Sequence, residues 1–313
     1  MKAWVYTGII LCLLLQGMTG DRGTGTLTAH VLQYGGIDRQ YLKYLPAEDF
    51  NRSLPVLFCL HGGGGKARGM IRLTKSRFHS LADNSGFIVI YPQGVDKGWN
   101  DGRIGDYSTA TRENIDDVGF IREIIFELSN THDIAADRIF ATGISNGGFM
   151  SMRLACELPQ LIRGAAVVAA TIGEEFAANC RGEGPVNILI MNGMNDPLVP
   201  FSGGYVKVLR KTRGKILSTY DAVNLWVERN GCKQDPETVS MPDADPADGT
   251  TIQKISYTNG KDGTSVVLYE IMNGGHTWPG GVQYLGERLI GKTSRDINAC
   301  EEIWRFFSEA MVQ

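Results

Sequence analysis

The sequence predicts an α/β fold with a mainly parallel central sheet and helices on both faces. Apolar runs of strand length recur along the chain, and most of them lack the polar alternation of half-exposed strands. These runs are residues 56–60, 87–91, 138–142, 165–169, 186–191 and 265–272. Segments with helical spacing lie between them, which is the order of elements that covers both faces of a parallel sheet.

Helical spacing is clearest where Val118, Ile121, Ile124, Ile125 and Leu128 follow two aspartates suited to a first helical turn. Residues 217–229 and the chain end, with its apolar Ile303, Phe306, Phe307 and Ala310, also predict helices. Residues 27–33 and 40–45 predict two strands around a Gly-Gly turn. The segment 235–250, rich in Pro and Asp, is interpreted as a surface loop.

The first 20 residues predict a signal peptide. Lys2 is followed by an apolar run over 3–15 and by small and polar residues at 17–20. The run is shorter than the roughly 20 residues that a bilayer span needs, which disfavours a membrane anchor. We therefore expect a secreted protein (extracellular or periplasmic) that is not held in a membrane, with residues 21–313 as one domain.

Charge and cysteine content exclude several classes of function. The net charge is −3, and residues of both charge signs are interspersed along the chain. The sequence has no basic stripe, which argues against nucleic acid or an anionic membrane as a partner. Of six cysteines, five follow the predicted signal, so at least one is unpaired. The cysteines show no C-x-x-C spacing, so the sequence does not indicate a zinc site. Cys59 lies inside an apolar run, which predicts a buried free thiol.

The strongest chemical signal is Gly-Ile-Ser-Asn-Gly at 143–147, between a predicted strand and a predicted helix. A nucleophilic serine needs this tight turn, which exposes its hydroxyl and tolerates only glycine two residues to either side. Ser145 is therefore the candidate nucleophile. A glycine-rich helix start capped by the serine is the structural alternative.

A run of four glycines after His61 follows another predicted strand. In α/β-hydrolases the corresponding loop donates one backbone N–H to the oxyanion hole, and the residue after the nucleophile donates the other. We expect Gly63 and Asn146 in these roles. The run lacks the G-K-S/T ending of a phosphate-binding loop and does not match G-x-G-x-x-G, which disfavours a nucleotide-binding role.

The candidate base and acid follow from chain order, which in this fold is serine, acid, histidine. Of five histidines, His276 alone follows Ser145, and it lies just after a predicted strand. Asp196 follows the strand between them and would orient the imidazole. Asp221 and Asp243 are more distant alternatives.

Together these segments resemble the secreted polyhydroxybutyrate depolymerase and feruloyl esterase group, which belongs with carbohydrate esterase family one. The matching stretches run through nearly the whole mature chain: Leu-His-Gly-Gly at 60–63, Tyr-Pro-Gln-Gly at 91–94, Gly-Trp-Asn at 98–100, 116–120, 143–148, 192–197 and Gly-His-Thr-Trp-Pro-Gly-Gly at 275–281. The nucleophile segment and the last of these are the most specific.

The resemblance implies an α/β-hydrolase fold with the triad Ser145, Asp196 and His276. It also implies that Trp99 and Trp278 line the acyl or alcohol pocket, with core packing as the structural alternative. The family pattern implies a disulfide between Cys156 and Cys180. Nothing in the chain calls for a metal, nucleotide, flavin or other cofactor.

We therefore expect a serine carboxylic ester hydrolase that works through an acyl-enzyme. The segment between Ser145 and Asp196 already contains two predicted strands, which leaves no room for a large lid and favours an open groove for polymer-borne esters. Feruloyl, other hydroxycinnamoyl or acetyl esters of plant polysaccharide are the expected substrates. The alternatives are a polyhydroxybutyrate-type polyester and, less favoured, a serine peptidase or a non-catalytic carbohydrate-binding protein.

Overall fold

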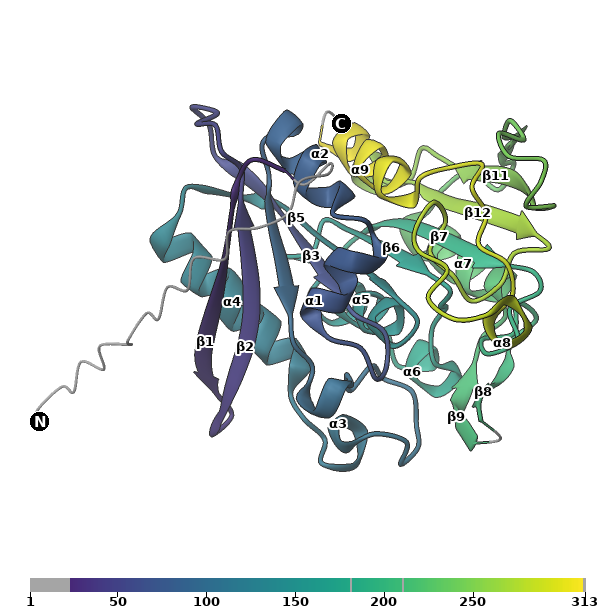
Figure 1. Ribbon diagram of the computed structural model, residues 1–313, viewed down its shortest axis with the longest axis horizontal. Helices are drawn as coiled ribbons and strands as arrows, with labels where there is room; N and C mark the ends of the chain where they lie inside the picture. Colours follow the sequence, from purple (N-terminus) through teal and green to yellow (C-terminus); the bar gives the residue numbers. More distant parts are fainter. Residues whose placement is uncertain (1–22, 181, 210, 312–313) are drawn as a thin grey trace, which may run out of the picture.

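A ten-stranded sheet runs through the computed structural model, which describes residues 23–180, 182–209 and 211–311. Its strands, in spatial order, are β1 (Thr26–Tyr34), β2 (Ile37–Leu45), β4 (Ile88–Pro92), β3 (Leu54–Leu60), β5 (Ile134–Ile144), β6 (Gly164–Val168), β7 (Asn187–Gly193), β12 (Val266–Met272), β11 (Thr251–Tyr257) and β10 (Glu237–Ser240). The strands from β4 to β12 are parallel, and antiparallel strands extend both edges (Figure 1). The predicted fold class is confirmed, whereas the predicted signal peptide, residues 1–20, lies outside the described residues.

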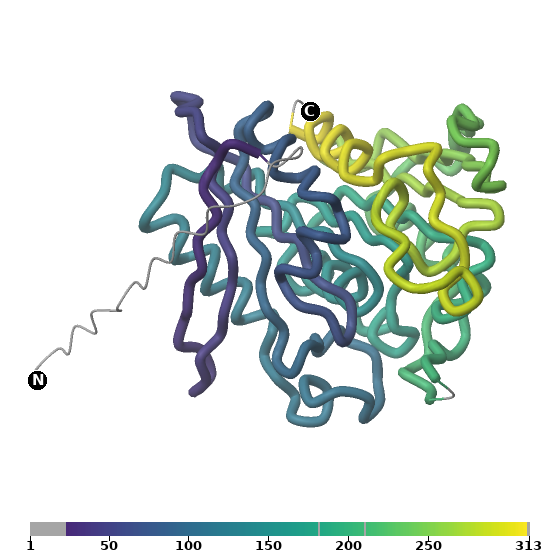
Figure 2. Tube along the Cα trace, viewed as in Figure 1, coloured from purple at the N-terminus to yellow at the C-terminus, as the bar shows by residue number. Residues whose placement is uncertain are grey.

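Helices cover both faces of the sheet. One face carries α1 (Ala67–Leu73), α2 (Arg77–Ser85) and α9 (Ala299–Ala310), and the other carries α4 (Asp117–Thr131), α5 (Asn146–Glu157) and α7 (Thr219–Asn230) (Figure 1). The C-terminal α9 packs beside α2, so the end of the chain returns to its first helices (Figure 2). In the described part of the chain, no helix is long and apolar enough to cross a membrane.

Successive residues of the central strands enter different cores, which explains their unbroken apolar runs. In β3, Leu57 and Cys59 pack in the core under α1, α2 and α9, while Val56 and Phe58 pack in the core under α4 and α5. Both faces are therefore largely apolar, and a buried polar side chain such as Thr142 needs a partner, which it finds in the carbonyl of Ala166 at 2.8 Å.

Short elements fill the connections, and four of the strands were not predicted: β8, β9, β10 and β11. The short helices are α3 (Thr109–Arg112), α6 (Glu174–Ala178), α8 (Glu287–Ile290), and two single turns at Val95–Lys97 and Lys261–Gly263. After β7 the chain forms a separate antiparallel hairpin of β8 (Gly204–Val208) and β9 (Lys211–Ile216). The interpretation of 235–250 as loop was wrong at β10, because its four exposed residues carry no apolar pattern.

The predicted disulfide between Cys156 and Cys180 is present, with the two Cα atoms 5.5 Å apart. It ties the last turn of α5 to the segment that follows α6. Three cysteines, Cys59, Cys232 and Cys300, are buried free thiols. The bridge therefore anchors the far end of the helix that begins next to Ser145.

Reduction of this bridge should destabilise the protein by about 3 kcal/mol, because the chain-entropy model gives that value for a loop of roughly this length. The bridge spans 24 residues in sequence. Urea unfolding with and without reductant measures the change in unfolding free energy. The double variant Cys156→Ala/Cys180→Ala should be insensitive to reductant. Equal sensitivity in wild type and double variant would contradict the prediction.

Candidate active site

Ser145 lies at the turn between β5 and α5, with φ 54° and ψ −122°, a strained conformation for any residue with a side chain. The turn admits only glycine at its flanks. A Cβ on Gly143 would lie 2.5 Å from the carbonyl of Gly147, and a Cβ on Gly147 would lie 2.3 Å from the carbonyl oxygen of Leu60. The turn therefore holds the serine at the carboxyl end of the central strands, where it remains partly exposed.

Asp196 and His276 meet because their strands are neighbours. The parallel strands β7 and β12 leave the sheet at the same edge, and each residue lies in the loop after one of them. His276 Nδ1 is 2.6 Å from Asp196 Oδ2, and the two side chains are only 5% and 2% exposed. The loops cross closely, since a Cβ on Gly193 would lie 2.3 Å from the carbonyl oxygen of Gly274.

Backbone groups fix the orientation of this acid–base pair. The second oxygen of Asp196 accepts from the N–H groups of Leu198 (2.7 Å) and Val199 (2.9 Å), which fixes the orientation of the carboxylate. The Nδ1–H of His276 therefore donates to the carboxylate, and Nε2 is left as the proton acceptor. The Tyr284 hydroxyl donates to the backbone carbonyl of His276 at 2.8 Å and holds the loop from the other side.

The alternative acids lie elsewhere. Asp221 is exposed and accepts from Ser218 at the start of α7, and Asp243 is exposed in the segment after β10. Of the three candidate carboxylates, only that of Asp196 is hydrogen-bonded to His276.

Ser145 and His276 line one cavity of about 810 Å³. The glycine run after β3 forms one wall, and the β8–β9 hairpin contributes Val206, Val208 and Arg213 to another. The cavity therefore joins the candidate nucleophile and base to a wall that sequence reasoning did not find.

Gly63 and Asn146, the residues expected to form the oxyanion hole, both line the cavity that Ser145 lines. A Cβ on Gly63 would lie 3.5 Å from that of Asn146, so the two backbones pass close together. Within the described residues, neither backbone N–H donates to another group. Asn146 is also the first residue of α5, so its N–H is one that the helix itself leaves unpaired.

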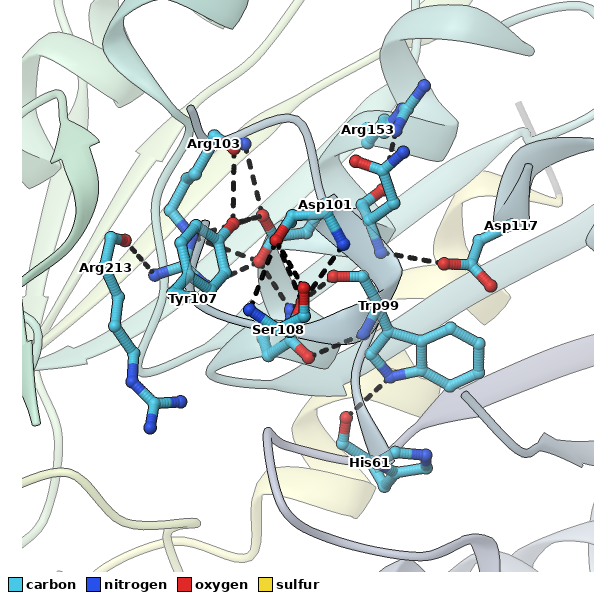
Figure 3. A network of polar contacts seen from close by, with 12 residues as sticks. His61, Trp99, Asp101, Arg103, Tyr107, Ser108, Asp117, Arg153 and Arg213 are labelled. Atoms are coloured by element: carbon cyan, nitrogen blue, oxygen red, sulfur yellow. Dashed lines mark hydrogen bonds and ion pairs between the residues drawn. The ribbon is translucent and has the colours of Figure 1, made fainter. Parts of the chain in front are cut away.

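The side chain of Asn146 is anchored to the loop after β4, whose Trp99 and Asp101 are labelled in Figure 3. Its Oδ1 accepts from the backbone N–H of Trp99 at 2.9 Å, and its Nδ2 donates to Asp101 Oδ2 at 2.6 Å. Asp101 also accepts from Arg103 Nη2 (2.6 Å) and from the Tyr107 hydroxyl (2.7 Å). These buried charge-assisted bonds hold the start of α5, and with it the candidate oxyanion hole.

Trp99 and Trp278 do not contact the cavity, which corrects the prediction that they line a substrate pocket. Both rings are 0% exposed and neither is in the cavity wall. The indole N–H of Trp99 donates to the carbonyl of His61 at 2.9 Å, and the ring of Trp278 packs edge-on against Phe78 at 6.2 Å. The loops that carry them turn these rings into the core, where they support the glycine run and the His276 loop.

His61 supports the glycine run as a neutral imidazole. Its Nε2 accepts from the backbone N–H of Gly94 at 3.0 Å, so Nδ1 carries the proton and donates to the carbonyl of Gly62 at 2.8 Å. Burial lowers the pKa of His61 to about 4. His61, which directly precedes the glycine run, is thus a structural residue.

Sequence reasoning missed Asp101, Arg103, Tyr284 and Arg213. Asp101 directly follows the Gly-Trp-Asn segment, which was a usable signal. The other three carry none, because their roles arise from contacts between segments distant in the chain.

Gly147→Ala should destabilise the protein by several kcal/mol or prevent folding, because its methyl group would meet the Leu60 carbonyl at 2.3 Å. Gly69→Ala in α1 is the matched control: its Cβ would meet nothing within 4 Å, and helix propensity predicts a gain of about 0.5–1 kcal/mol. Thermal unfolding measures both changes. Equal stability of the two variants would contradict the steric account of the turn.

Comparisons with known proteins agree with this geometry. The chain is 31% identical over 285 residues to the putative esterase NocK of Nocardia uniformis, covering 88% of this chain and 81% of that protein. It is 26% identical over 267 residues to a probable feruloyl esterase C of Aspergillus niger, covering 81% and 86%. No protein-family model matches the chain.

Among solved structures, an acetyl xylan esterase from Aspergillus awamori superposes with a TM-score of 0.58 at 14% identity, covering 90% of this chain and 99% of that one. At this identity the likeness shows the fold alone, which is that of the α/β-hydrolases. With the relatives above, it follows that the chain is a carboxylic ester hydrolase and belongs to the esterase family that includes NocK and the feruloyl esterases.

Proposed function

We propose that the protein is a secreted serine esterase that forms an acyl-enzyme on Ser145, with His276 as base and Asp196 as the orienting acid. The observation that carries this proposal is the buried hydrogen bond between His276 and Asp196, in a cavity whose wall includes Ser145. When a carboxylate accepts the Nδ1–H of a histidine, it holds the ring in one orientation and leaves Nε2 free to accept a proton.

In the proposed mechanism, His276 Nε2 takes the hydroxyl proton as Ser145 Oγ bonds to the ester carbonyl carbon. The carbonyl π electrons move to oxygen, where the N–H groups of Gly63 and Asn146 stabilise the negative charge. The carbonyl re-forms as the C–O bond to the alcohol breaks, and the imidazolium gives its proton to the leaving oxygen. Water then repeats these steps on the acyl-enzyme and releases the acid.

The proposed substrates are hydroxycinnamoyl or acetyl esters carried by plant polysaccharide. Relatives named feruloyl esterase support this class, and a cavity of about 810 Å³ has room for a phenylpropenoyl group. Trp99 and Trp278 do not contribute to this support, because both rings are buried. Tyr107 and Tyr284 are the aromatic residues in the wall that remain available to such a group.

A polyhydroxybutyrate-type polyester is the rival substrate. Leu198, Val206, Val208 and Val282 give part of the cavity an aliphatic wall, which suits a short hydroxyacyl chain. The two classes differ in the shape of the acyl group, so a substrate panel separates them.

Secretion is supported by the apolar segment that begins the chain and by the Cys156–Cys180 disulfide, a bond typical of oxidising compartments.

Ser145→Ala should abolish ester hydrolysis with little loss of stability, because it removes the nucleophile and almost no packing. Asp196→Asn should lower kcat by several orders of magnitude, as loss of the orienting acid does in other triads. Release of nitrophenol from nitrophenyl acetate measures both. In wild type a fluorophosphonate probe should label Ser145, detected by peptide mass spectrometry.

Matched controls use residues of the same types outside the cavity. Ser202→Ala and Asp221→Asn change an exposed serine and an exposed aspartate, and both should retain wild-type rates. Full activity in Ser145→Ala would refute the assignment of the nucleophile.

A panel of methyl ferulate, acetylated xylan and polyhydroxybutyrate film should show the highest kcat/KM on one of the two polysaccharide-type esters. The reaction is followed by released ferulate, acetate or hydroxybutyrate. Preference for the film would replace the polysaccharide assignment with the polyester one and leave the triad assignment standing.

A further inference from the structure

The cavity at Ser145 is strongly cationic although the whole chain has a net charge of −3. Among the described residues, six basic ones line it: Lys66, Arg72, Lys97, Arg103, Arg112 and Arg213. Asp96 is the single carboxylate residue that the described part of the same wall contains. An excess of one sign in a concave site raises the local concentration of ligands of the opposite sign.

Two of these cations are neutralised within the protein. Arg103 is paired with the buried Asp101, and Arg112 is 3.3 Å from Asp106. In contrast, Arg213 has no carboxylate partner in the described part of the chain. A guanidinium in a cavity without a counter-charge is available to an anionic ligand.

Arg213 stands beside the proposed oxyanion hole. Its Nη1 lies 3.7 Å from the position that a Cβ would take on Gly63. The guanidinium is therefore within reach of groups a few atoms from a carbonyl carbon bonded to Ser145. It is also only partly exposed, so solvent screens its charge less than that of a surface arginine.

The backbone of Arg213 is fixed by the Asp101 network. Its carbonyl accepts from Arg103 Nη1 at 2.9 Å, and its guanidinium extends away from the Arg103–Asp101 pair (Figure 3). Gly214 packs directly on Arg103, since a Cβ there would lie 2.9 Å from the Arg103 Cβ, and its φ of +82° suits glycine. The hairpin thus presents Arg213 to the cavity from a backbone held in place, which limits the ordering cost of binding.

We propose that Arg213 is an anion-recognition residue, and that the preferred substrates are esters carrying a carboxylate a few atoms from the scissile carbonyl. The inference rests on the proposed function, since it needs Ser145 as the reacting residue. The carboxylate belongs either to the acyl group, as in a half-ester of a dicarboxylic acid, or to the alcohol, as in an acylated uronic acid. The planar guanidinium binds either one through two parallel N–H bonds.

The test compares kcat/KM for charged and neutral esters of matched shape. One pair is monomethyl succinate and methyl butyrate, and the other is the acetyl ester of methyl glucuronoside and that of methyl glucoside. In at least one pair, wild type should prefer the charged ester by about tenfold or more, and added salt should shrink that preference. The pair that shows it identifies the source of the carboxylate.

Arg213→Gln should bring the charged-to-neutral ratio close to one. Arg213→Lys should lose less of the ratio because the charge remains. Lys211→Gln is the matched control, since it removes a charge from an exposed residue of the same hairpin outside the cavity wall, and its ratio should equal that of wild type. Thermal unfolding of each variant checks that the hairpin stays folded.

Three results would overturn the inference. Wild type that hydrolyses charged and neutral esters equally well would refute it and leave the proposed esterase function intact. An equal fall on both members of a pair in Arg213→Gln would mean that Arg213 acts on the reacting carbonyl and not on a carboxylate. No hydrolysis of any ester by wild type, with Ser145 unlabelled by fluorophosphonate, would remove the proposed function as well.

Discussion

The buried carboxylate of Asp101 is the group on which the candidate site depends most. It binds the side chain of Asn146, the guanidinium of Arg103 and the hydroxyl of Tyr107. Through Asn146 it fixes the start of α5, and through Arg103 it fixes the hairpin wall. Loss of this carboxylate would leave a buried cation without its partner, at a cost of about 3–5 kcal/mol. The turn that carries Ser145 and the cavity wall formed by the β8–β9 hairpin are therefore held rigidly relative to each other.

Strand order supplies the second constraint. The strands β5, β7 and β12 are parallel, so the loops that follow them all emerge at one edge of the sheet. Ser145, Asp196 and His276 come from these three loops, although they lie far apart in the chain. The apolar cores on both faces hold the strands in place, and the glycines at the loop crossings let the loops approach each other.

Much of the fold and the candidate triad positions were readable in the sequence, because both depend on local patterns. Buried strands appear as apolar runs, and the turn around Ser145 needs glycines at fixed offsets. The strands β8, β9, β10 and β11 were not predicted, because their residues are mostly exposed or half-buried and contain no unbroken apolar run. Trp99 and Trp278 were placed at the correct sheet edge, but nothing in the sequence indicated that both rings turn inward. Arg213 carried no signal for the same reason: its position depends on Arg103.

The hairpin β8–β9 forms a sheet of its own, separate from the ten-stranded one. Its two ends join the chain after the Asp196 turn and before α7, and its two strands pair with each other and not with the ten-stranded sheet. The hairpin is accordingly a segment whose sequence can vary without moving any main-sheet strand. Substrate specificity and the stability of the fold therefore depend on different parts of the chain. Homologues can diverge in the ligands they accept by exchanging this one short insertion. An engineer can likewise graft other hairpins here onto an unchanged scaffold.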